Sequence, residues 1–196
     1  MRGELKHIQK TLGTTTVYVT HDQLEGMSMA DRIAIMRDGV LQQIGTPYEV
    51  FNRPTNTWVA TFVGDPPMNI LNGELHAADD GLVVSAPEFT IVVPPAPAAA
   101  LYKAPLQGNK VQVGIRPEAL TLSLVRDSSH PIAGRVYAVQ PLGDVEIVDV
   151  RVGEDRILVR TELGTIGNQD MDAAIYLGYK PEKLHFFDAV TGLRLS

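Results

Sequence analysis

The sequence predicts an α+β protein in two parts, a mixed helix-and-strand segment over residues 1–64 and an all-β domain over residues 65–196. In the first part, apolar residues recur mostly at helical spacing. In the second part they fall in short runs that are separated by Gly, Pro, Asp and Asn. Between the parts stands Asp65-Pro66-Pro67, and a double proline cannot continue a helix. We therefore place the domain boundary at Asp65.

The first part begins with three predicted elements. A helix is expected over residues 4–12, where apolar side chains repeat at helical spacing until Gly13 can end it. Residues 14–20 (TTTVYVT) are β-branched and apolar, which predicts a buried strand. A second helix is expected over residues 23–31, with Asp22 as its N-cap.

Three further elements complete this part. A hairpin is predicted over residues 33–44, because an Asp-Gly pair separates two apolar runs. Thr46 and Glu49 have the spacing of a capping box, which predicts the start of a helix at Pro47. A last helix is expected over residues 58–63, where the apolar residues form one face.

The second part is predicted to be a small barrel or sandwich, because many short strands follow one another with regular turn signals. The clearest strand has Val148, Val150 and Val152 alternating with polar residues, as in a half-buried antiparallel strand. The Pro- and Ala-rich residues 94–100 predict an extended surface connection. The expected strands are residues 68–77, 82–84, 89–93, 111–115, 132–139, 145–152 and 156–161.

Composition limits the classes of function. The 196 residues carry a net charge of −6, so no basic footprint points to a nucleic-acid partner. The absence of cysteine excludes disulfides and thiolate metal sites, and is compatible with a reducing cytosol. No apolar run approaches the length of a membrane span. The histidines lack the spacing of metal ligands, so we expect no metal site.

His21 is the most informative residue, because it stands where the predicted strand meets a helix N-terminus, and such junctions favour phosphate binding. The runs VTHDQ at residues 19–23 and DRIAIMRDG at residues 31–39 resemble the switch-histidine segment of ABC-transporter ATPase subunits. The resemblance implies that His21 contacts the γ-phosphate of ATP in the intact subunit and is the catalytic switch residue.

Three stretches beyond residue 61 resemble the appended TOBE domain of sugar and glycerol-phosphate importer ATPases. They are FVGDPPMNIL at residues 62–71, VGIRPE at residues 113–118 and KPEKLHFFD at residues 180–188. The resemblance implies that residues 1–64 are the C-terminal piece of a P-loop ATPase α/β domain, also called the nucleotide-binding domain. It implies that residues 65–196 are an OB-like TOBE regulatory domain.

The family's chemistry requires a GxxxxGK[ST] phosphate loop, a catalytic glutamate and a Ser-Gly-Gly-Gln signature, and none of these occurs in this sequence. We expect the chain to be the C-terminal portion of a longer ATPase and to be inactive alone, with no cofactor of its own. ATP and Mg would serve the intact subunit. With the rest of the sheet missing, residues 14–20 would lack neighbouring strands, so we expect self-association or a rearrangement of that segment.

The resemblance also implies the partners and the location. These are membrane permease subunits, a second ATPase subunit in a homodimer, and a regulatory protein or small ligand at the TOBE domain. The protein would lie in the cytoplasm, on the inner face of the cell membrane through its permeases. The function implied is ATP-driven import of a carbohydrate or related solute. The alternative is a non-catalytic OB-like module that binds a small ligand or a regulator.

Other candidate residues have structural interpretations. Arg116 and Glu118 could suggest a carboxylate–guanidinium site, but we favour a role in fixing the turn at Pro117. His185, beside two phenylalanines, is interpreted as a packed strand residue. The transported solute is not encoded in these residues.

Overall fold

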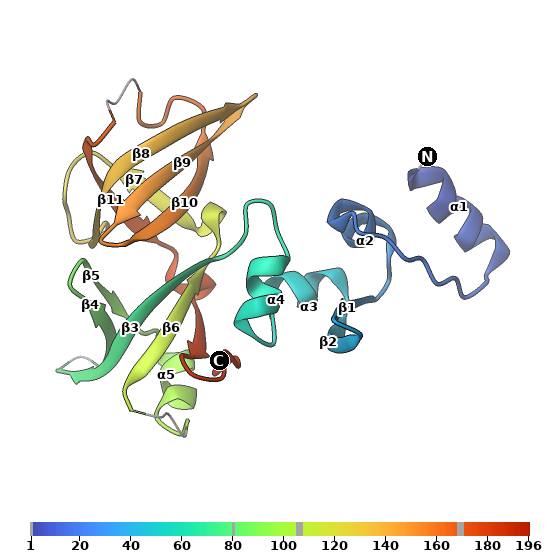
Figure 1. The fold of residues 1–196 in the computed structure, drawn as a ribbon, viewed down its shortest axis with the longest axis horizontal. Helices are drawn as coiled ribbons and strands as arrows, with labels where there is room; N and C mark the ends of the chain where they lie inside the picture. Colours follow the sequence, from blue (N-terminus) through green and yellow to red (C-terminus); the bar gives the residue numbers. More distant parts are fainter. Residues whose placement is uncertain (1, 80, 105–107, 168–170) are drawn as a thin grey trace. The chain divides into compact units, whose positions relative to one another are not determined.

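The computed structural model describes residues 2–79, 81–104, 108–167 and 171–196. It divides into two compact units, Met1–Asp65 and Pro66–Ser196 (Figure 1). Among the described residues, no helix has both the length and the apolar character needed to cross a membrane. The predicted fold class is confirmed, since the chain is mostly β-sheet with a few helices.

The first unit contains four helices and one hairpin among its described residues. Asp38 and Gly39 both have positive φ at the hairpin turn, as a type I′ turn requires. The predicted capping box is present, because the Glu49 N–H donates to Thr46 Oγ1 and the Thr46 N–H donates to the Glu49 carboxylate. The elements are α1 (Arg2–Leu12), α2 (Gln23–Met29), β1 (Ile33–Arg37), β2 (Val40–Gly45), α3 (Pro47–Asn52) and α4 (Thr57–Phe62).

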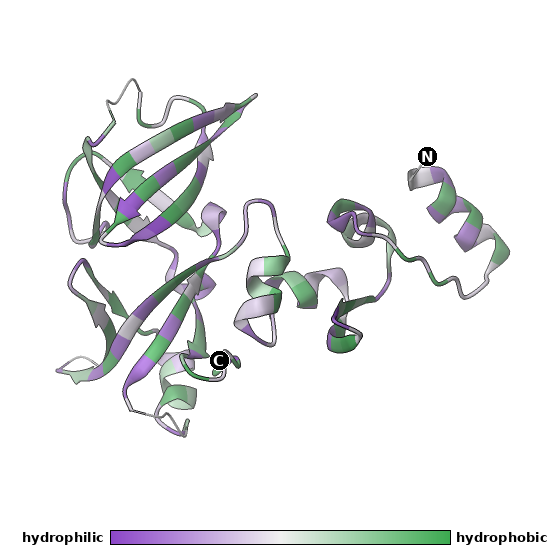
Figure 2. Cartoon of the chain, viewed as in Figure 1, coloured by the Kyte–Doolittle hydropathy of each residue, from purple (hydrophilic) through white to green (hydrophobic). Residues whose placement is uncertain are grey.

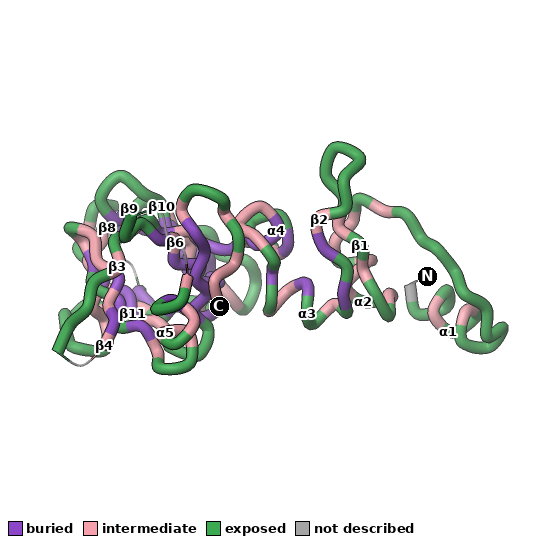
Figure 3. Tube along the Cα trace, turned by 90° about the horizontal axis from the view of Figure 1, so that it is seen from below, coloured by how far each residue is buried: buried purple, intermediate pink, exposed green. Residues whose placement is uncertain are grey.

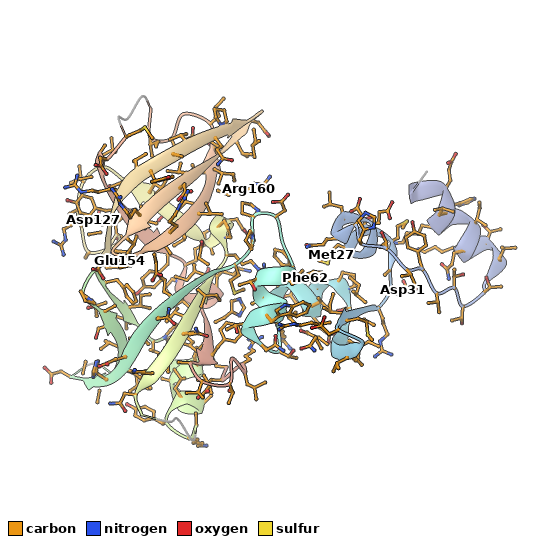
Figure 4. All side chains as sticks on the ribbon, viewed as in Figure 1. Met27, Asp31, Phe62, Asp127, Glu154 and Arg160 are labelled. Carbon is orange, nitrogen blue, oxygen red and sulfur yellow. The ribbon has the colours of Figure 1, made fainter. Side chains whose placement is uncertain are left out.

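The core of the first unit is small. Val50, Val59 and Val63 are buried together, and partly buried side chains pack around them. Among these are Met27 on α2, labelled in Figure 4, and Trp58 on α4. This cluster joins α2, the hairpin and the two short helices that follow it.

The predicted buried strand over residues 14–20 is wrong. This segment belongs to no strand, and the side chains of Val17 and Val19 are 87% and 89% exposed. Figure 3 shows the connection between α1 and α2 as exposed over almost its whole length. The reason is that β-branched residues form a buried strand only when neighbouring strands and covering helices exist. Helix α2 is also shorter than predicted, because Ala30 adopts an extended backbone.

In the part of the chain that the structure describes, the second unit contains two five-stranded antiparallel sheets. The first has the order β12-β6-β3-β4-β5, and the second has the order β10-β9-β8-β11-β7. The two edge strands of the second sheet, β7 and β10, approach each other, so this sheet curls toward a barrel. The strands are β3 (Asn69–Ala78), β4 (Gly81–Ala86), β5 (Phe89–Val92), β6 (Lys110–Ile115), β7 (Leu120–Ser123), β8 (Ile132–Leu142), β9 (Val145–Val152), β10 (Asp155–Glu162), β11 (Ala174–Tyr179) and β12 (His185–Asp188).

Both sheets contribute to one hydrophobic core. Val113 and Phe186 enter it from the first sheet, and Val150 and Ile175 enter it from the second. Hydrophobic and hydrophilic bands alternate along β8, β9 and β10 in Figure 2, as expected for strands with one buried face. The unit therefore has the layered core of an OB-like domain.

The predicted surface connection over residues 94–100 is wrong, because Pro95–Leu101 forms the helix α5. Proline is tolerated at the first positions of a helix, and the alanines that follow have high helix propensity. Leu101, at the end of α5, is buried in the core. Short 3₁₀ turns occupy Pro117–Ala119 and Pro181–Lys183.

Candidate functional site

His21 lies at a bend immediately before α2, and its side chain is exposed. Hydrogen bonds hold the backbone on both sides of it. The Asp22 N–H donates to Thr20 Oγ1 at 3.0 Å, and the Glu25 N–H donates to the Asp22 carboxylate at 3.1 Å. The Thr20 hydroxyl in turn donates to the Glu25 carboxylate at 2.8 Å. Asp22 is thus the N-cap of α2, and His21 is presented outward.

Three adjacent strands of the first sheet bring together parts of the stretches at residues 62–71, 113–118 and 180–188. Ile70 in β3 and His185 in β12 both pair with Gly114 in β6. A Cβ at Gly114 would lie 2.6 Å from Met68 Sδ and 2.8 Å from the Phe187 ring, so only glycine fits there. These stretches therefore meet in the packed interior of the sheet.

Arg116 and His185 are buried side chains at this place, 4% and 7% exposed. Burial lowers the pKa of Arg116 to about 10. The negative charge of Glu118 acts in the opposite direction and raises this pKa, but its effect is smaller. Burial also lowers the pKa of His185 to about 4, helped by the positive charges of Arg194, Arg116 and Lys183. His185 is therefore a packed strand residue, as predicted, and is neutral at pH 7.

Asn69 joins the two sheets of the second unit. Its side-chain amide donates to the carbonyl of Leu158 at 2.8 Å and to that of Ile115 at 3.2 Å. The Leu158 N–H donates back to Asn69 Oδ1 at 2.8 Å. The amide thus pairs with β10 as a neighbouring strand would. Sequence reasoning quoted Asn69 within a motif but assigned it no role.

Charged residues that sequence reasoning missed lie on the second sheet. Arg151 Nη2 donates to Asp172 Oδ1 at 2.6 Å. Arg156 forms an ion pair with the buried Asp149, and its guanidinium lies 3.9 Å from the centroid of the Tyr137 ring. The signal for part of this group was available, because the predicted strands 145–152 and 156–161 flank a tight turn that brings Arg151 opposite Arg156.

The described residues contain no group of three or more His, Asp or Glu side chains that could hold a metal ion. Arg116 and Glu118 flank Pro117 at a 3₁₀ turn, where the buried Arg116 is the N-cap residue. Exposed polar side chains are found instead at His21 and on the charged outer face of the second sheet.

Comparison with known families matches both parts of the second unit. Residues 64–120 match the family described as the MalK OB fold domain, and residues 113–187 match the TOBE domain. A solved structure of the cytoplasmic molybdate-binding protein ModG, 14% identical, covers 60% of this chain and 94% of its own, with a TM-score of 0.49.

Similar proteins extend the match over the whole chain. The chain is 40% identical to the trehalose/maltose import ATP-binding protein MalK of Thermococcus litoralis, over 98% of this chain and 51% of that protein. It is 35% identical to the sn-glycerol-3-phosphate import ATP-binding protein UgpC of Bordetella pertussis, over 100% of this chain and 52% of that protein. It is 38% identical to the sulfoquinovosyl glycerol transport ATP-binding protein SmoE of Agrobacterium fabrum, over 97% of this chain and 51% of that protein. The chain spans about half the length of these curated relatives.

Proposed function

Because the chain belongs to the family of import ATP-binding subunits and matches their C-terminal part, we propose that it works within an ABC importer for a carbohydrate or related solute. ATP hydrolysis by the intact subunit would drive the transport. The observation that carries this proposal is the match over the whole chain to three such subunits, which includes both the His21 segment and the regulatory domain.

His21 is the residue to which we assign chemistry in the intact subunit. Its exposed imidazole, on a backbone fixed by Thr20 and Asp22, can reach a ligand held by another part of the protein. Contact with the terminal phosphate of bound ATP and Mg would let it report the phosphate to the catalytic groups, since phosphoryl transfer depends on positioning and charge. This sequence contains no phosphate loop, so the chain alone should neither bind ATP saturably nor hydrolyse it.

The partners follow from the same proposal. Permease subunits would hold the protein at the cytoplasmic face of the membrane, and the subunit would act as a homodimer. The domain at residues 65–196 would contribute to dimer contact or regulation, by a protein or by a small ligand.

A chimera tests the proposal. The C-terminal half of the Thermococcus MalK protein would be replaced by this chain, and the chimera would be assembled with the permeases of that relative in proteoliposomes. We expect ATP-dependent sugar uptake, which His21→Ala should abolish. The control is His76→Ala, because His76 is also exposed but lies on β3. A folded chimera without uptake, or uptake unchanged by His21→Ala, would contradict the proposal.

The second candidate is a non-catalytic OB-like module that recognises a small ligand or a regulator. A hollow on the second sheet favours it, lined by Arg135, Arg151 and Tyr176 among others. Ligand binding by the chain in the absence of ATP would distinguish this function from a purely structural role in a dimer.

A further inference from the structure

The outer face of the second sheet carries a row of three arginines. Arg135 in β8 lies directly opposite Arg151 in β9, and Arg156 in β10 lies opposite Arg151 on the other side. Directly opposed residues in antiparallel strands project from the same face, and like charges there repel each other. Oxygen atoms placed among the guanidinium groups reduce this repulsion.

Each of these arginines has an oxygen partner. Arg156 pairs with the Asp149 carboxylate. Arg151 donates to the Asp172 carboxylate, and Arg135 Nη1 donates to the Asp172 carbonyl at 2.6 Å. Asp172 has a φ of 68°, a left-handed conformation that is costly for a residue other than glycine. Two arginines and the hydrogen bond from the Asp172 N–H to the Val136 carbonyl hold it there. Its backbone is thus held in place, and its exposed carboxylate pairs with Arg151.

Next to Arg135 and Arg151 the sheet is hollow, with a volume of about 320 Å³. Small residues form the floor, and Tyr176 lines one side. The small residues are Ala133, Gly134, Gly153 and Ala174. A Cβ at Gly153 would lie 2.8 Å from the carboxylate of Glu88, so this carboxylate lies beside the same hollow. The volume is near the lower end of the roughly 300–1,000 Å³ found for small-molecule sites.

The balance of charge determines which ligand fits. Arg135 and Arg151 line the hollow, and two carboxylates lie next to lining residues. The Asp172 carboxylate accepts from Arg151, and the Glu88 carboxylate lies beside Gly153. An inorganic anion would meet both carboxylates, and a cation would meet both guanidinium groups. A hydroxyl group donates and accepts at once, so a molecule with several hydroxyls can satisfy both kinds of partner. Tyr176 and the alanines offer apolar surface to the C–H face of a sugar ring.

We propose that this hollow is a binding site for a neutral carbohydrate of one or two rings. Its existence rests on the geometry above. We infer that the site senses, on the cytoplasmic side, the class of solute that is imported. This role of the site rests on the proposed function. An importer subunit with this site would respond to accumulated sugar through its regulatory domain.

The test is a titration of the full 196-residue chain followed by amide chemical shifts. We expect trehalose, maltose or glucose to produce saturable shifts at residues around the hollow, with a dissociation constant on the order of 1 mM. Arg151→Ala should weaken binding about tenfold, because it removes a charged hydrogen-bond donor. Ala133→Leu should abolish it by filling the hollow without removing a polar group. The control is Arg160→Ala, an exposed arginine on β10 that is not among the residues lining the hollow and is labelled in Figure 4.

Each of several results would overturn the site. The first is that none of the three sugars produces a saturable shift. The second is that Arg151→Ala and Ala133→Leu both fold and both leave binding unchanged. The third is that inorganic phosphate binds more tightly than sugar. The titration requires neither ATP nor permeases. Failure here would leave the proposed transport function standing, and failure of uptake by the chimera would leave this site standing.

Discussion

The two units differ in how much apolar surface they bury. In the first unit, the described core has three buried valines, Val50, Val59 and Val63. In the second, 24 buried apolar residues among those described form one continuous cluster that is shared by both sheets. Burying a large apolar side chain stabilises by roughly 1.5–3 kcal/mol, so the small core offsets the entropy of ordering only a few residues. We therefore predict that the second unit folds on its own and that the first unit does not.

The largest effect should appear when the two units are separated. Residues 66–196 alone should give a β-sheet circular-dichroism spectrum and one cooperative thermal transition, because the cluster lies entirely within them. Residues 1–65 alone should show no cooperative transition. A disordered spectrum for residues 66–196 would contradict the comparison, as would a cooperative transition for residues 1–65.

The next effect concerns association. Val17 and Val19 are large exposed apolar residues in an extended segment, so we propose that two copies of the chain associate through residues 14–20. Burying about 400 Å² of apolar surface would contribute roughly 10 kcal/mol before entropy costs. Sedimentation at micromolar concentration should show a dimer that Val17→Glu with Val19→Glu converts to monomer. Val125→Glu with Val190→Glu, two valines of the second unit that are 70% and 62% exposed, should not. A monomeric wild type, with residues 14–20 protected from hydrogen exchange, would refute it.

These differences also explain what could be predicted from the sequence. The hairpin at Asp38-Gly39 and the capping box at Thr46 were predictable, because they depend on residues a few positions apart. Residues 14–20 have strand propensity, but burial depends on neighbours that a propensity does not contain. Strand β11 was missed because Gly178 weakens its pattern. There a Cβ would lie 2.5 Å from the Ser129 carbonyl, which is a tertiary reason for glycine.

The candidate site was predictable only in part. The capping role of Asp22 follows from local sequence. The position of His21 was predicted only in part, because it precedes helix α2 as expected but no strand leads into it. The pairing of Arg151 with Arg156 could be read from two strands and a tight turn. The approach of Asp172 and Glu88 to the hollow could not, because both come from loops whose positions are set by the folded sheet.

Within the second unit, the comparison predicts a large cost for loss of a core side chain. Phe186 is fully buried in the shared cluster, so Phe186→Ala should lower the free energy of unfolding of this unit by about 3–5 kcal/mol. Tyr102→Ala, at an exposed position of the same unit, should change it by no more than about 0.5 kcal/mol. Urea denaturation of residues 66–196 measures both. Equal midpoints for the two variants would show that the cluster does not carry the fold.

A smaller effect should depend on pH. The pKa of His185 is about 4 in the folded protein and 6.5 in the unfolded chain, so between these values the unfolded state binds more protons. The stability contribution is complete above pH 6.5 and is lost as the pH falls toward 4, at most about 3 kcal/mol in total. His185→Gln should flatten the stability curve between pH 6.5 and 4, whereas His76→Gln, at an exposed position, should not. A wild-type curve that is flat over this range would contradict the burial of a neutral histidine.

The smallest effect is expected where one side chain joins the two sheets. Asn69 exchanges two hydrogen bonds with Leu158 and donates a third to Ile115. Asn69→Ala would leave the backbone N–H and carbonyl of Leu158 without these partners, at a cost of about 1–3 kcal/mol for a buried polar group. The loss should be local, so hydrogen exchange should accelerate at Leu158 more than at Val150, which pairs within the second sheet. Asn72→Ala is the control, because Asn72 is an exposed amide on the same strand that accepts a hydrogen bond from the neighbouring Gln112 in the same sheet. If Asn69→Ala and Asn72→Ala had equal effects, the amide would not join the sheets, and their shared apolar core would be their only connection.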